Sequence, residues 1–320
     1  MTRPILLQLV PLPDHPALQR VDQYYERVLN DETQPLPDAL AQRVQLVLAT
    51  ATTPITAAFM DTLPALRGIC NIGVGFDAID RSHAHQRGVA VSNTPDVLND
   101  CVADLAWALM LDTARRVSAA DRYVRAGQWT HEHGFPLSTR VSGKKLGIVG
   151  LGRIGQAIAK RASGFDMQLR YHNRRPRKDI SWHYEPSLIE LAHWADILVV
   201  AAVGGDETRG LINRAVLDAL GTRGILINIA RGSVVDERAL VQALQEGRLG
   251  GAGLDVFECE PQVPAALRQL DQVVLTPHVA SATHETRAAM LGLALDNILH
   301  FQETGKLLTP VPYPTQKSPA

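Results

Sequence analysis

Residues 145–155 read Lys-Leu-Gly-Ile-Val-Gly-Leu-Gly-Arg-Ile-Gly, a short apolar run that leads directly into the pattern G-x-G-x-x-G. The glycines of this pattern are Gly150, Gly152 and Gly155, and an amphipathic segment follows them at once. A strand, a glycine turn and a helix in this order predict a dinucleotide-binding fold, because the glycines permit a tight turn, a close approach of the pyrophosphate and close packing of the helix. The N–H groups at the start of the helix would bind the phosphates.

The glycine motif begins almost halfway along a chain of 320 residues, so a sizeable region precedes it. This length favours two domains. Apolar runs alternate with helical stretches on both sides of the motif, which is typical of α/β domains with doubly wound parallel sheets covered by helices. In the first part we expect strands at 5–10, 44–49, 68–72 and 89–92 and helices at 17–29, 55–63 and 81–87. Beyond it we expect a helix at 99–116, strands at 146–149, 167–171, 197–201, 225–229, 252–256 and 273–275, and a final helix at 285–301.

The composition is that of an ordinary globular protein, with 46% apolar and 20% charged residues. A formal net charge of −1 argues against a general binder of nucleic acid or anionic membranes. The 3 cysteines lie far apart, form no C-x-x-C pair and suit a reducing cytoplasm. No apolar run approaches the length of a membrane span. His131-Glu132-His133 has no supporting cluster of ligands, so we expect no metal site.

The turn after the expected strand 167–171 bears on the choice of cofactor. NAD-binding folds usually carry an acidic residue about 20 residues after the glycine motif, where it binds the ribose 2′-OH. Here residues 172–178 read His-Asn-Arg-Arg-Pro-Arg-Lys and include no carboxylate. Because guanidinium groups bind phosphate in a bidentate manner, we expect Asn173, Arg174 and Arg175 to favour NADP(H). NAD(H) stays open as the second cofactor, and a solvated basic turn is the alternative interpretation.

Each of the last three expected strands is followed by polar residues. They are Arg231, then Glu258 and Glu260, and finally His278. Ligands of open α/β sheets bind at the carboxyl ends of the strands. Each residue alone would fit a surface or structural role, but an arginine, a carboxylate and a histidine at one edge, beside a nicotinamide, predict a hydride-transfer site.

Several stretches together carry a resemblance to a known family. They are Gly-Val-Gly-Phe-Asp at 73–77, Asn-Thr-Pro-Asp at 93–96, Gly-Leu-Gly-Arg-Ile-Gly at 150–155, Asn-Ile-Ala-Arg-Gly at 228–232, Gly-Leu-Asp-Val-Phe-Glu-Cys-Glu-Pro at 253–261 and Thr-Pro-His at 276–278. With them the chain resembles the D-isomer-specific 2-hydroxyacid dehydrogenases. Ala-Ser-Ala-Thr-His at 280–284 and the basic turn look most like the glyoxylate/hydroxypyruvate reductase branch. The 2-ketogluconate and hydroxyphenylpyruvate reductases are similar neighbours.

The resemblance implies a domain layout and an assembly. A Rossmann coenzyme domain at 99–286 would be inserted in a flavodoxin-like substrate domain made of 1–98 and 287–320. The helix 99–116 and the loop after it would form a homodimer interface, from which Phe135 or Leu137 would reach the partner's pocket.

The resemblance also implies catalytic roles. Arg231 would bind the carboxylate and keto oxygen of the substrate, and His278 would donate a proton to that oxygen. Glu260 would hold the imidazole and favour its charged form. The backbone N–H groups of Val74 and Gly75 would bind the substrate carboxylate from the first domain, and Ser281 would approach the substrate.

The implied cofactor contacts form a larger set. Thr208 belongs to a segment, 203–208, that departs from the Leu-Thr-Pro-type loop of many relatives, which puts the ribose contacts there in question. The expected contacts are Val102, Gly150, Gly152, Arg153, Ile154, Gly155, Asn173, Arg174, Arg175, Thr208, Ala230, Asp255 and His278.

The function implied is NADPH-dependent reduction of a small 2-keto acid, such as glyoxylate, hydroxypyruvate or 2-ketogluconate. A corepressor-like module that binds the nucleotide with little turnover is the alternative from another class. A dehydrogenase of formate or phosphite fits less well, because formate enzymes of this type carry Gln where Glu260 stands.

Overall fold

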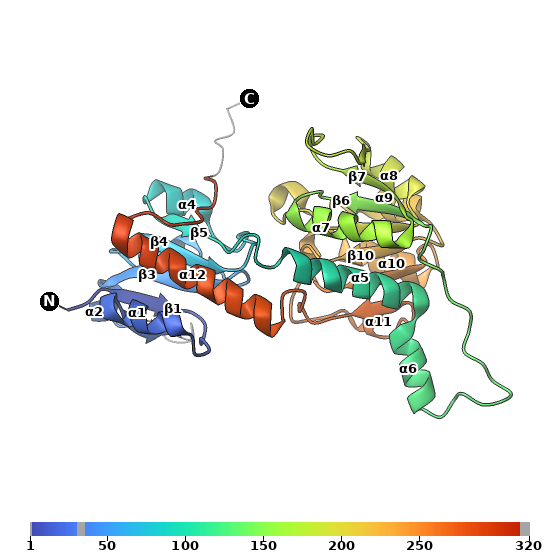
Figure 1. The fold of residues 1–320 in the computed structure, drawn as a ribbon, viewed down its shortest axis with the longest axis horizontal. Coiled ribbons are helices and arrows are strands. Elements are labelled where there is room, and N and C mark those ends of the chain that lie inside the picture. Colours follow the sequence, from blue (N-terminus) through green and yellow to red (C-terminus); the bar gives the residue numbers. More distant parts are fainter. Residues whose placement is uncertain (1, 31–35, 314–320) are drawn as a thin grey trace. The chain divides into compact units, whose positions relative to one another are not determined.

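The computed structural model describes residues 2–30 and 36–313. The chain divides into two compact units (Figure 1). Unit 1 comprises Met1–Leu98 and Thr283–Ala320, and unit 2 comprises Asn99–Ala282. Unit 2 is therefore inserted into the chain of unit 1.

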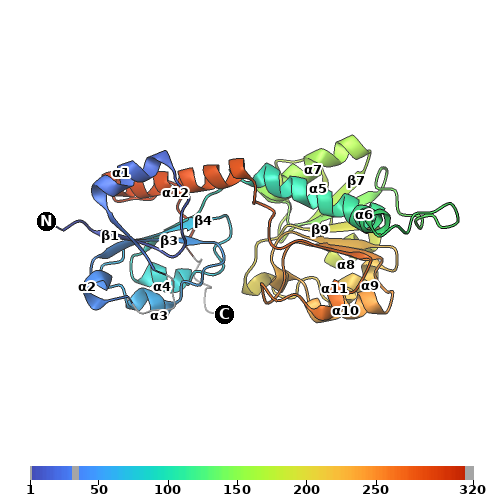
Figure 2. The same ribbon diagram turned by 90° about the horizontal axis from the view of Figure 1, so that it is seen from below.

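Unit 1 is built on a parallel sheet of 5 strands in the order β2-β1-β3-β4-β5, which is the flavodoxin-like order. Helices cover both faces, with α1 and α12 on one side and α2, α3 and α4 on the other (Figure 2). The strands are β1 (Ile5–Gln8), β2 (Glu26–Leu29), β3 (Val44–Thr50), β4 (Gly68–Ile72) and β5 (Ala90–Ser92). The helices are α1 (Pro16–Tyr24), α2 (Asp38–Ala41), α3 (Ala57–Asp61), α4 (Arg81–Gln86) and α12 (His284–Thr304).

The predicted helix at 17–29 is wrong in its second half. Helix α1 ends at Tyr24, and Glu26–Leu29 form the edge strand β2, which pairs with β1. Tyr25 adopts extended dihedral angles, φ −120° and ψ 147°, and its buried side chain ends the helix against the core. Leu18, Val21, Tyr25 and Val28 are spaced as on one face of a helix, so their periodicity did not reveal the change to a strand.

Unit 2 is built on a parallel sheet of 7 strands in the order β12-β11-β10-β9-β6-β7-β8. This is the Rossmann order with one further strand. The six predicted strands are all present, and β8 was missed because 2 residues are too few to show a pattern. The strands are β6 (Lys145–Val149), β7 (Gln168–His172), β8 (His183–Tyr184), β9 (Ile197–Val200), β10 (Ile225–Asn228), β11 (Gly251–Leu254) and β12 (Val273–Leu275).

The helices of unit 2 also lie on both faces of its sheet (Figure 2). Helices α5 (Asn99–Arg115) and α7 (Arg153–Arg161) lie on one side, and the other side is covered by α8 (Leu188–Trp194), α9 (Arg214–Leu220), α10 (Glu237–Gln245) and α11 (Ala265–Arg268). Trp107 anchors α5 on α7, because its indole N–H donates to the Ile158 carbonyl at 3.1 Å and its ring stacks on Phe165. Within residues 2–30 and 36–313, no helix is both long and apolar enough to cross a lipid bilayer.

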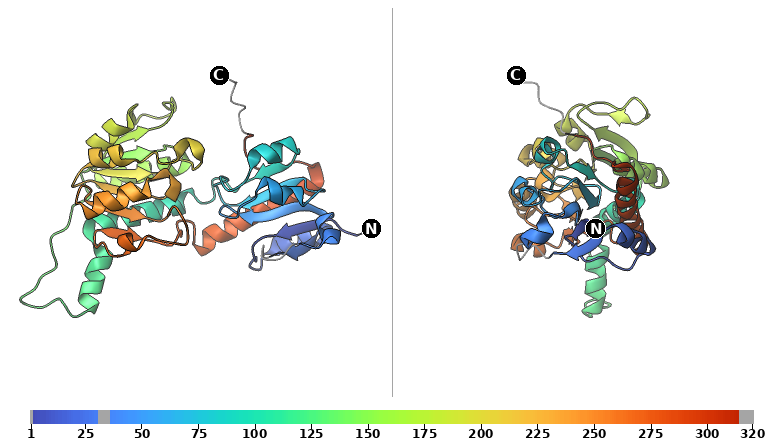
Figure 3. Two further views of the ribbon diagram at one scale, coloured as in Figure 1. Left: turned by 180° about the vertical axis from the view of Figure 1, so that it is seen from behind. Right: turned by 90° about the vertical axis from the view of Figure 1, so that its left-hand side faces the viewer.

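Helix α6 (Val117–Arg125) differs from the other α-helices of unit 2. It buries none of its residues, and with the segment that follows it extends away from the sheet of unit 2 (Figures 1 and 3). Trp129 and Leu137 in that segment are exposed, Leu137 completely. Apolar side chains of this size are usually covered by another surface.

Candidate active site

The glycine turn between β6 and α7 has the geometry of a phosphate cradle. Gly150 has a φ of +94°, and a Cβ there would lie 2.5 Å from the amide nitrogen of Ala202. A Cβ on Gly155 would lie 2.3 Å from the Gly150 carbonyl oxygen. At Gly152, the N-cap of α7, a Cβ would meet nothing within 4 Å, and no side chain caps the helix. The start of α7 therefore has space beside Gly152 and no side-chain cap, which fits a dinucleotide pyrophosphate.

Two side chains of the turn after β7 hold this glycine turn. Asn173 Oδ1 accepts a hydrogen bond from the Leu151 amide at 2.7 Å, and Arg177 Nη1 donates to the Leu151 carbonyl at 3.2 Å. Arg177 also pairs with Asp179. The sequence placed Arg177 in the basic run without distinguishing it from its neighbours, so its contact with the glycine turn was missed.

The two arginines expected at a 2′-phosphate lie exposed in the same turn. Arg174 forms an ion pair with Glu207, which belongs to the short 3-10 helix η2 (Asp206–Thr208). Arg175 has no hydrogen-bond or ion-pair partner within the part of the chain that the structure describes. Thr208 does not point outward, since its hydroxyl donates to the Val203 carbonyl at 2.7 Å. The divergent segment 203–208 therefore borders the basic turn.

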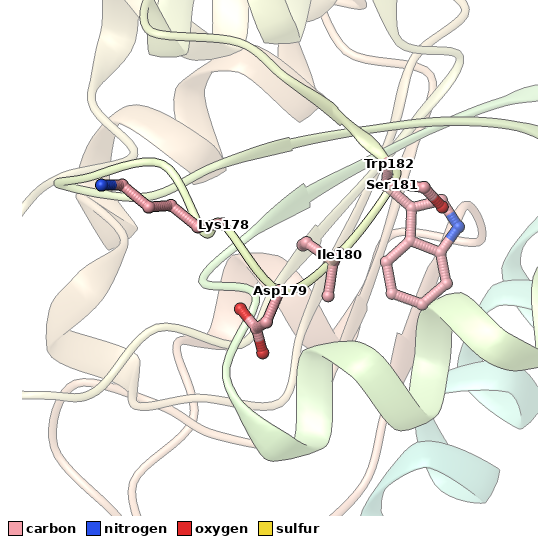
Figure 4. Close-up of a pocket in the computed structure, with 5 residues that line it drawn as sticks. All are labelled: Lys178, Asp179, Ile180, Ser181 and Trp182. Atoms are coloured by element: carbon pink, nitrogen blue, oxygen red, sulfur yellow. The ribbon is translucent and has the colours of Figure 1, made fainter.

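An open pocket of about 510 Å³ lies along the next part of this turn, lined by Lys178, Asp179, Ile180, Ser181 and Trp182 (Figure 4). The Lys178 and Trp182 side chains point away from each other there. None of the predicted site residues lines this pocket. It is formed by one surface segment, so we place the chemistry at the strand ends instead.

His278 and Glu260 form the centre of the site. The Glu260 carboxylate Oε2 lies 2.7 Å from His278 Nδ1, and its Oε1 accepts a hydrogen bond from the Phe257 amide at 3.0 Å. Burial acts to raise the pKa of Glu260, but these two hydrogen bonds and the positive charges of His278 and Arg231 outweigh it and hold that pKa below its usual range. Because Nδ1 is engaged, Nε2 is the ring nitrogen left to contact another molecule.

The backbone of His278 is held in an unusual conformation. Its φ is +51°, a region that non-glycine residues rarely adopt. Asp255, which is 0% exposed, braces this segment: Oδ1 accepts from the Thr276 hydroxyl at 2.7 Å and the Val279 amide at 2.8 Å, and Oδ2 accepts from the Ala280 amide at 3.0 Å. The buried Asp255 carboxylate thus fixes the segment on both sides of His278. Thr276 was quoted in the sequence motif but not recognised as part of this support.

Arg231 follows β10 and is oriented by a residue that the sequence analysis did not single out. Asn228, buried at the end of β10, accepts from the Ala230 amide at 3.1 Å and donates to the Arg231 carbonyl at 3.0 Å. Arg231 Nη1 in turn donates to the Ala230 carbonyl at 2.8 Å. An amide side chain in an otherwise apolar strand was the signal that could have indicated this role.

Arg153 and Ile154 begin α7, and two other predicted residues, Val102 and Ser281, adjoin residues of the segment 276–280 or its contacts. Val102 is buried at the start of α5, and its neighbour Cys101 donates from its thiol to the Ala280 carbonyl at 3.1 Å. Ser281 follows directly and is half-buried. Helix α5 and the histidine segment are therefore in contact.

Val74 and Gly75 lie in unit 1, in the turn after β4. Their carbonyl groups are held by side-chain amides: Asn93 donates to the Val74 carbonyl at 2.9 Å, and Asn71 donates to the Gly75 carbonyl at 2.7 Å. No hydrogen bond joins either amide N–H to another residue of 2–30 or 36–313. Two successive free N–H groups can bind an anion such as a carboxylate.

Comparison with known proteins shows the family of this chain. The family profile of the D-isomer specific 2-hydroxyacid dehydrogenase NAD binding domain matches residues 107–280. The glyoxylate/hydroxypyruvate reductase A of Arabidopsis thaliana is 49% identical over 270 residues, which cover 84% of this chain and 85% of that protein. This chain belongs to the D-isomer specific 2-hydroxyacid dehydrogenase family.

Other members of the D-isomer specific 2-hydroxyacid dehydrogenase family are similar along most of the chain. The 2-ketogluconate reductase of Gluconobacter oxydans is 47% identical over 257 residues, or 80% of this chain and 83% of that protein. The crystal structure of the NADPH-dependent glyoxylate/hydroxypyruvate reductase of Sinorhizobium meliloti, in complex with NADP and malonate, matches with a TM-score of 0.90 at 42% identity, covering 99% of this chain and 100% of that one.

These findings confirm the predicted family, its glyoxylate/hydroxypyruvate reductase branch and the α/β fold. They also confirm the predicted enzyme class, a 2-hydroxyacid dehydrogenase that uses a nicotinamide cofactor.

Proposed function

We propose that this chain reduces small 2-keto acids to 2-hydroxy acids with NADPH. Relatives are named as reductases of glyoxylate, hydroxypyruvate and 2-ketogluconate, which makes glyoxylate and hydroxypyruvate the first proposed substrates and 2-ketogluconate a larger one. The observation that carries the proposal is the 2.7 Å contact of His278 Nδ1 with Glu260, whose pKa is also lowered by the charge of Arg231. We therefore assign the acid to His278, its partner to Glu260 and the anion-binding group to Arg231, which follow β12, β11 and β10 in the chain.

Substrate binding is assigned to groups that suit a 2-keto acid. Arg231 binds the carboxylate and the keto oxygen, which polarises the carbonyl group and fixes its orientation. The N–H groups of Val74 and Gly75 are assigned to bind a substrate carboxylate, and Ser281 is assigned to contact the substrate. The hydrogen bonds from Asn228 keep the Arg231 backbone in place during this binding.

Proton transfer is assigned to His278. When bound, a reduced nicotinamide would supply the hydride. His278 donates its Nε2 proton to the keto oxygen as negative charge develops there, and accepts a proton in the reverse direction. Glu260 holds the ring through Nδ1 and stabilises the imidazolium form, while Asp255 keeps the left-handed backbone of His278 in position.

The glycine turn and its surroundings fit the cofactor. Gly150 and Gly155 permit the close packing of the turn, Gly152 leaves space beside it for the pyrophosphate, and Asn173 accepts a hydrogen bond from the turn. Arg174 and Arg175 face solvent, where a 2′-phosphate would be paired, and the relative from Sinorhizobium meliloti is described as NADPH-dependent. The further cofactor contacts that we propose are Val102, Arg153, Ile154, Thr208, Ala230, Asp255 and His278.

We also propose that the protein is a cytoplasmic homodimer. The exposed apolar residues of α6 and of the segment after it, Val117, Val124, Trp129 and Leu137, support a second copy as their cover. The three cysteines are free, which suits a reducing compartment.

Steady-state kinetics of the purified protein tests the proposal. Glyoxylate, hydroxypyruvate, phenylpyruvate and 2-ketogluconate are each assayed with NADPH and with NADH. We expect turnover of at least one of the first two, with a higher kcat/KM for NADPH. Tight cofactor binding without turnover of any 2-keto acid would instead favour the corepressor-like alternative.

A further inference from the structure

We propose that Glu207 weakens the preference for a 2′-phosphorylated cofactor by competing with the phosphate for the Arg174 guanidinium. This inference rests on the proposed NADPH preference and adds a residue that opposes it. The usual acidic residue is missing after β7, but the fold brings a carboxylate to the same turn from the segment after β9.

The three arginines of the turn are in three different situations. Arg177 is held by Asp179 and by the Leu151 carbonyl. Arg175 has no partner among the described residues, and Arg174 is paired with Glu207. Arg177 therefore serves the glycine turn, which leaves Arg174 and Arg175 for a phosphate, and only Arg174 must first give up a partner.

The position of Glu207 is set by its own segment. Gly205 has a φ of +128°, and the Thr208 hydroxyl donates to the carbonyls of Val203 at 2.7 Å and Gly205 at 3.2 Å. These contacts stabilise the turn that begins η2 and direct Glu207 toward the basic turn. The divergent glycine-rich sequence at 203–208 thus forms a turn that places Glu207 beside Arg174.

The ion pair is weak enough to be replaced. The Arg174 side chain is 82% exposed and that of Glu207 is 61% exposed, so water and salt screen their attraction. A 2′-phosphate carries more charge than a carboxylate and binds a guanidinium in the same bidentate manner. It therefore displaces Glu207, and binding is weakened by the lost ion pair and by repulsion from the released carboxylate. A ribose with a free 2′-OH meets neither cost.

The test measures binding of cofactor fragments to the full-length protein by isothermal titration calorimetry at low salt. Adenosine 2′,5′-bisphosphate reports on the 2′-phosphate, and adenosine 5′-monophosphate is the fragment without it. We expect Glu207→Gln to tighten the bisphosphate about two- to fivefold and to leave the monophosphate unchanged. The ratio of kcat/KM for NADPH to that for NADH should rise by the same factor.

Asp206→Asn is the matched control, because it removes the same charge from the same turn and no ion pair joins Asp206 to Arg174 in the described part of the chain. An equal effect of both variants would mean that the negative charge of the segment acts at long range and not through the ion pair, which would overturn the proposal. The absence of any effect of Glu207→Gln would overturn it as well. In Arg174→Gln, the additional substitution of Glu207 should have no further effect on bisphosphate binding.

Arg174→Gln also separates this inference from the proposed function. If it weakens bisphosphate binding while Glu207→Gln changes nothing, Arg174 binds the phosphate and only the competition fails. If Arg174→Gln and Arg175→Gln both leave the preference for bisphosphate over monophosphate unchanged, the proposed NADPH site at this turn fails with it.

Discussion

Gly232 lies directly against Phe257: a Cβ at residue 232 would come within 1.9 Å of the Phe257 carbonyl carbon. Gly232 follows Arg231 in the chain, and Phe257 donates its amide hydrogen to Glu260. The loop after β10 and the loop after β11 are therefore in backbone contact. Because no side chain separates them, Arg231 and Glu260 act from loops that cannot move independently.

Gly232→Ala should force these loops apart. Overpacking against backbone atoms costs about 1–3 kcal/mol of unfolding free energy, and misplacing Arg231 and Glu260 should lower kcat/KM at least about tenfold. Urea unfolding and steady-state kinetics measure the two effects. Gly164→Ala is the control, since a Cβ there meets nothing within 4 Å. Equal behaviour of the two variants would contradict a constraint at Gly232.

His278→Ala should reduce turnover of 2-keto acids by about 10²-fold or more, because no other group is assigned to protonate the keto oxygen. Cofactor binding, followed by the fluorescence of bound NADPH, should stay within about twofold of wild type. His133→Ala, in the exposed segment after α6, should leave both unchanged. Full turnover in His278→Ala would remove the histidine from the mechanism.

Glu260→Gln should change the pH dependence of stability. The pKa of Glu260 is lower in the folded protein than in the unfolded chain, so its contribution to stability is present above the unfolded-state value of about 4.3 and is lost as the pH falls through the folded-state value. The unfolding free energy of the wild type should therefore exceed that of the variant by on the order of 1 kcal/mol near pH 6. This excess should persist at pH about 4.3 and vanish only below it.

Urea unfolding of both proteins between pH 3 and 6 (about one point per half unit) measures this excess. A difference that stayed constant down to the lowest pH would mean that the carboxylate is not stabilised in the folded state.

The cysteines should differ sharply in reactivity. Burial raises the pKa of Cys70 to about 12, which keeps it a thiol at neutral pH, whereas Cys259 is exposed. A thiol reagent should modify Cys259 in the native protein and Cys70 only in denaturant, as followed by mass spectrometry of peptides. The variant Cys259→Ser should lose the rapid modification that the native protein shows at this position. Native-state labelling of Cys70 would show that the core of unit 1 opens.

The sequence predicted those parts of the site that depend on order along the chain. Arg231, Glu260 and His278 each follow a strand, and parallel strands bring their carboxyl ends to one edge, so their meeting could be inferred. Contacts that depend on the path of a loop could not be inferred from the sequence. Glu207 reaches Arg174 and Gly232 packs on Phe257 because of turn geometry, for which residue spacing gives no measure.

Secondary structure was predicted where a periodic pattern extended over several residues. The strands β6, β10 and β11 are largely apolar runs and were found nearly complete. The edge strand β2 was missed because Tyr25 and Val28 continue the helical spacing of α1, and tertiary packing of Tyr25 decided between the two structures. Asn228 and Asp255 were recognisable as polar residues at buried strand ends, but their partners were not.

The insertion of unit 2 has a consequence for the order in which the two units can fold on the ribosome. All of Asn99–Ala282 is contiguous, so its sheet can close as soon as β12 has emerged. Unit 1 has its five strands by then, but α12 and the buried Val311, whose amide bonds to the Val91 carbonyl, are still to be synthesised. The segment made first is thus completed last, and the N-terminal sheet must wait with one face partly uncovered while the inserted unit is already folded.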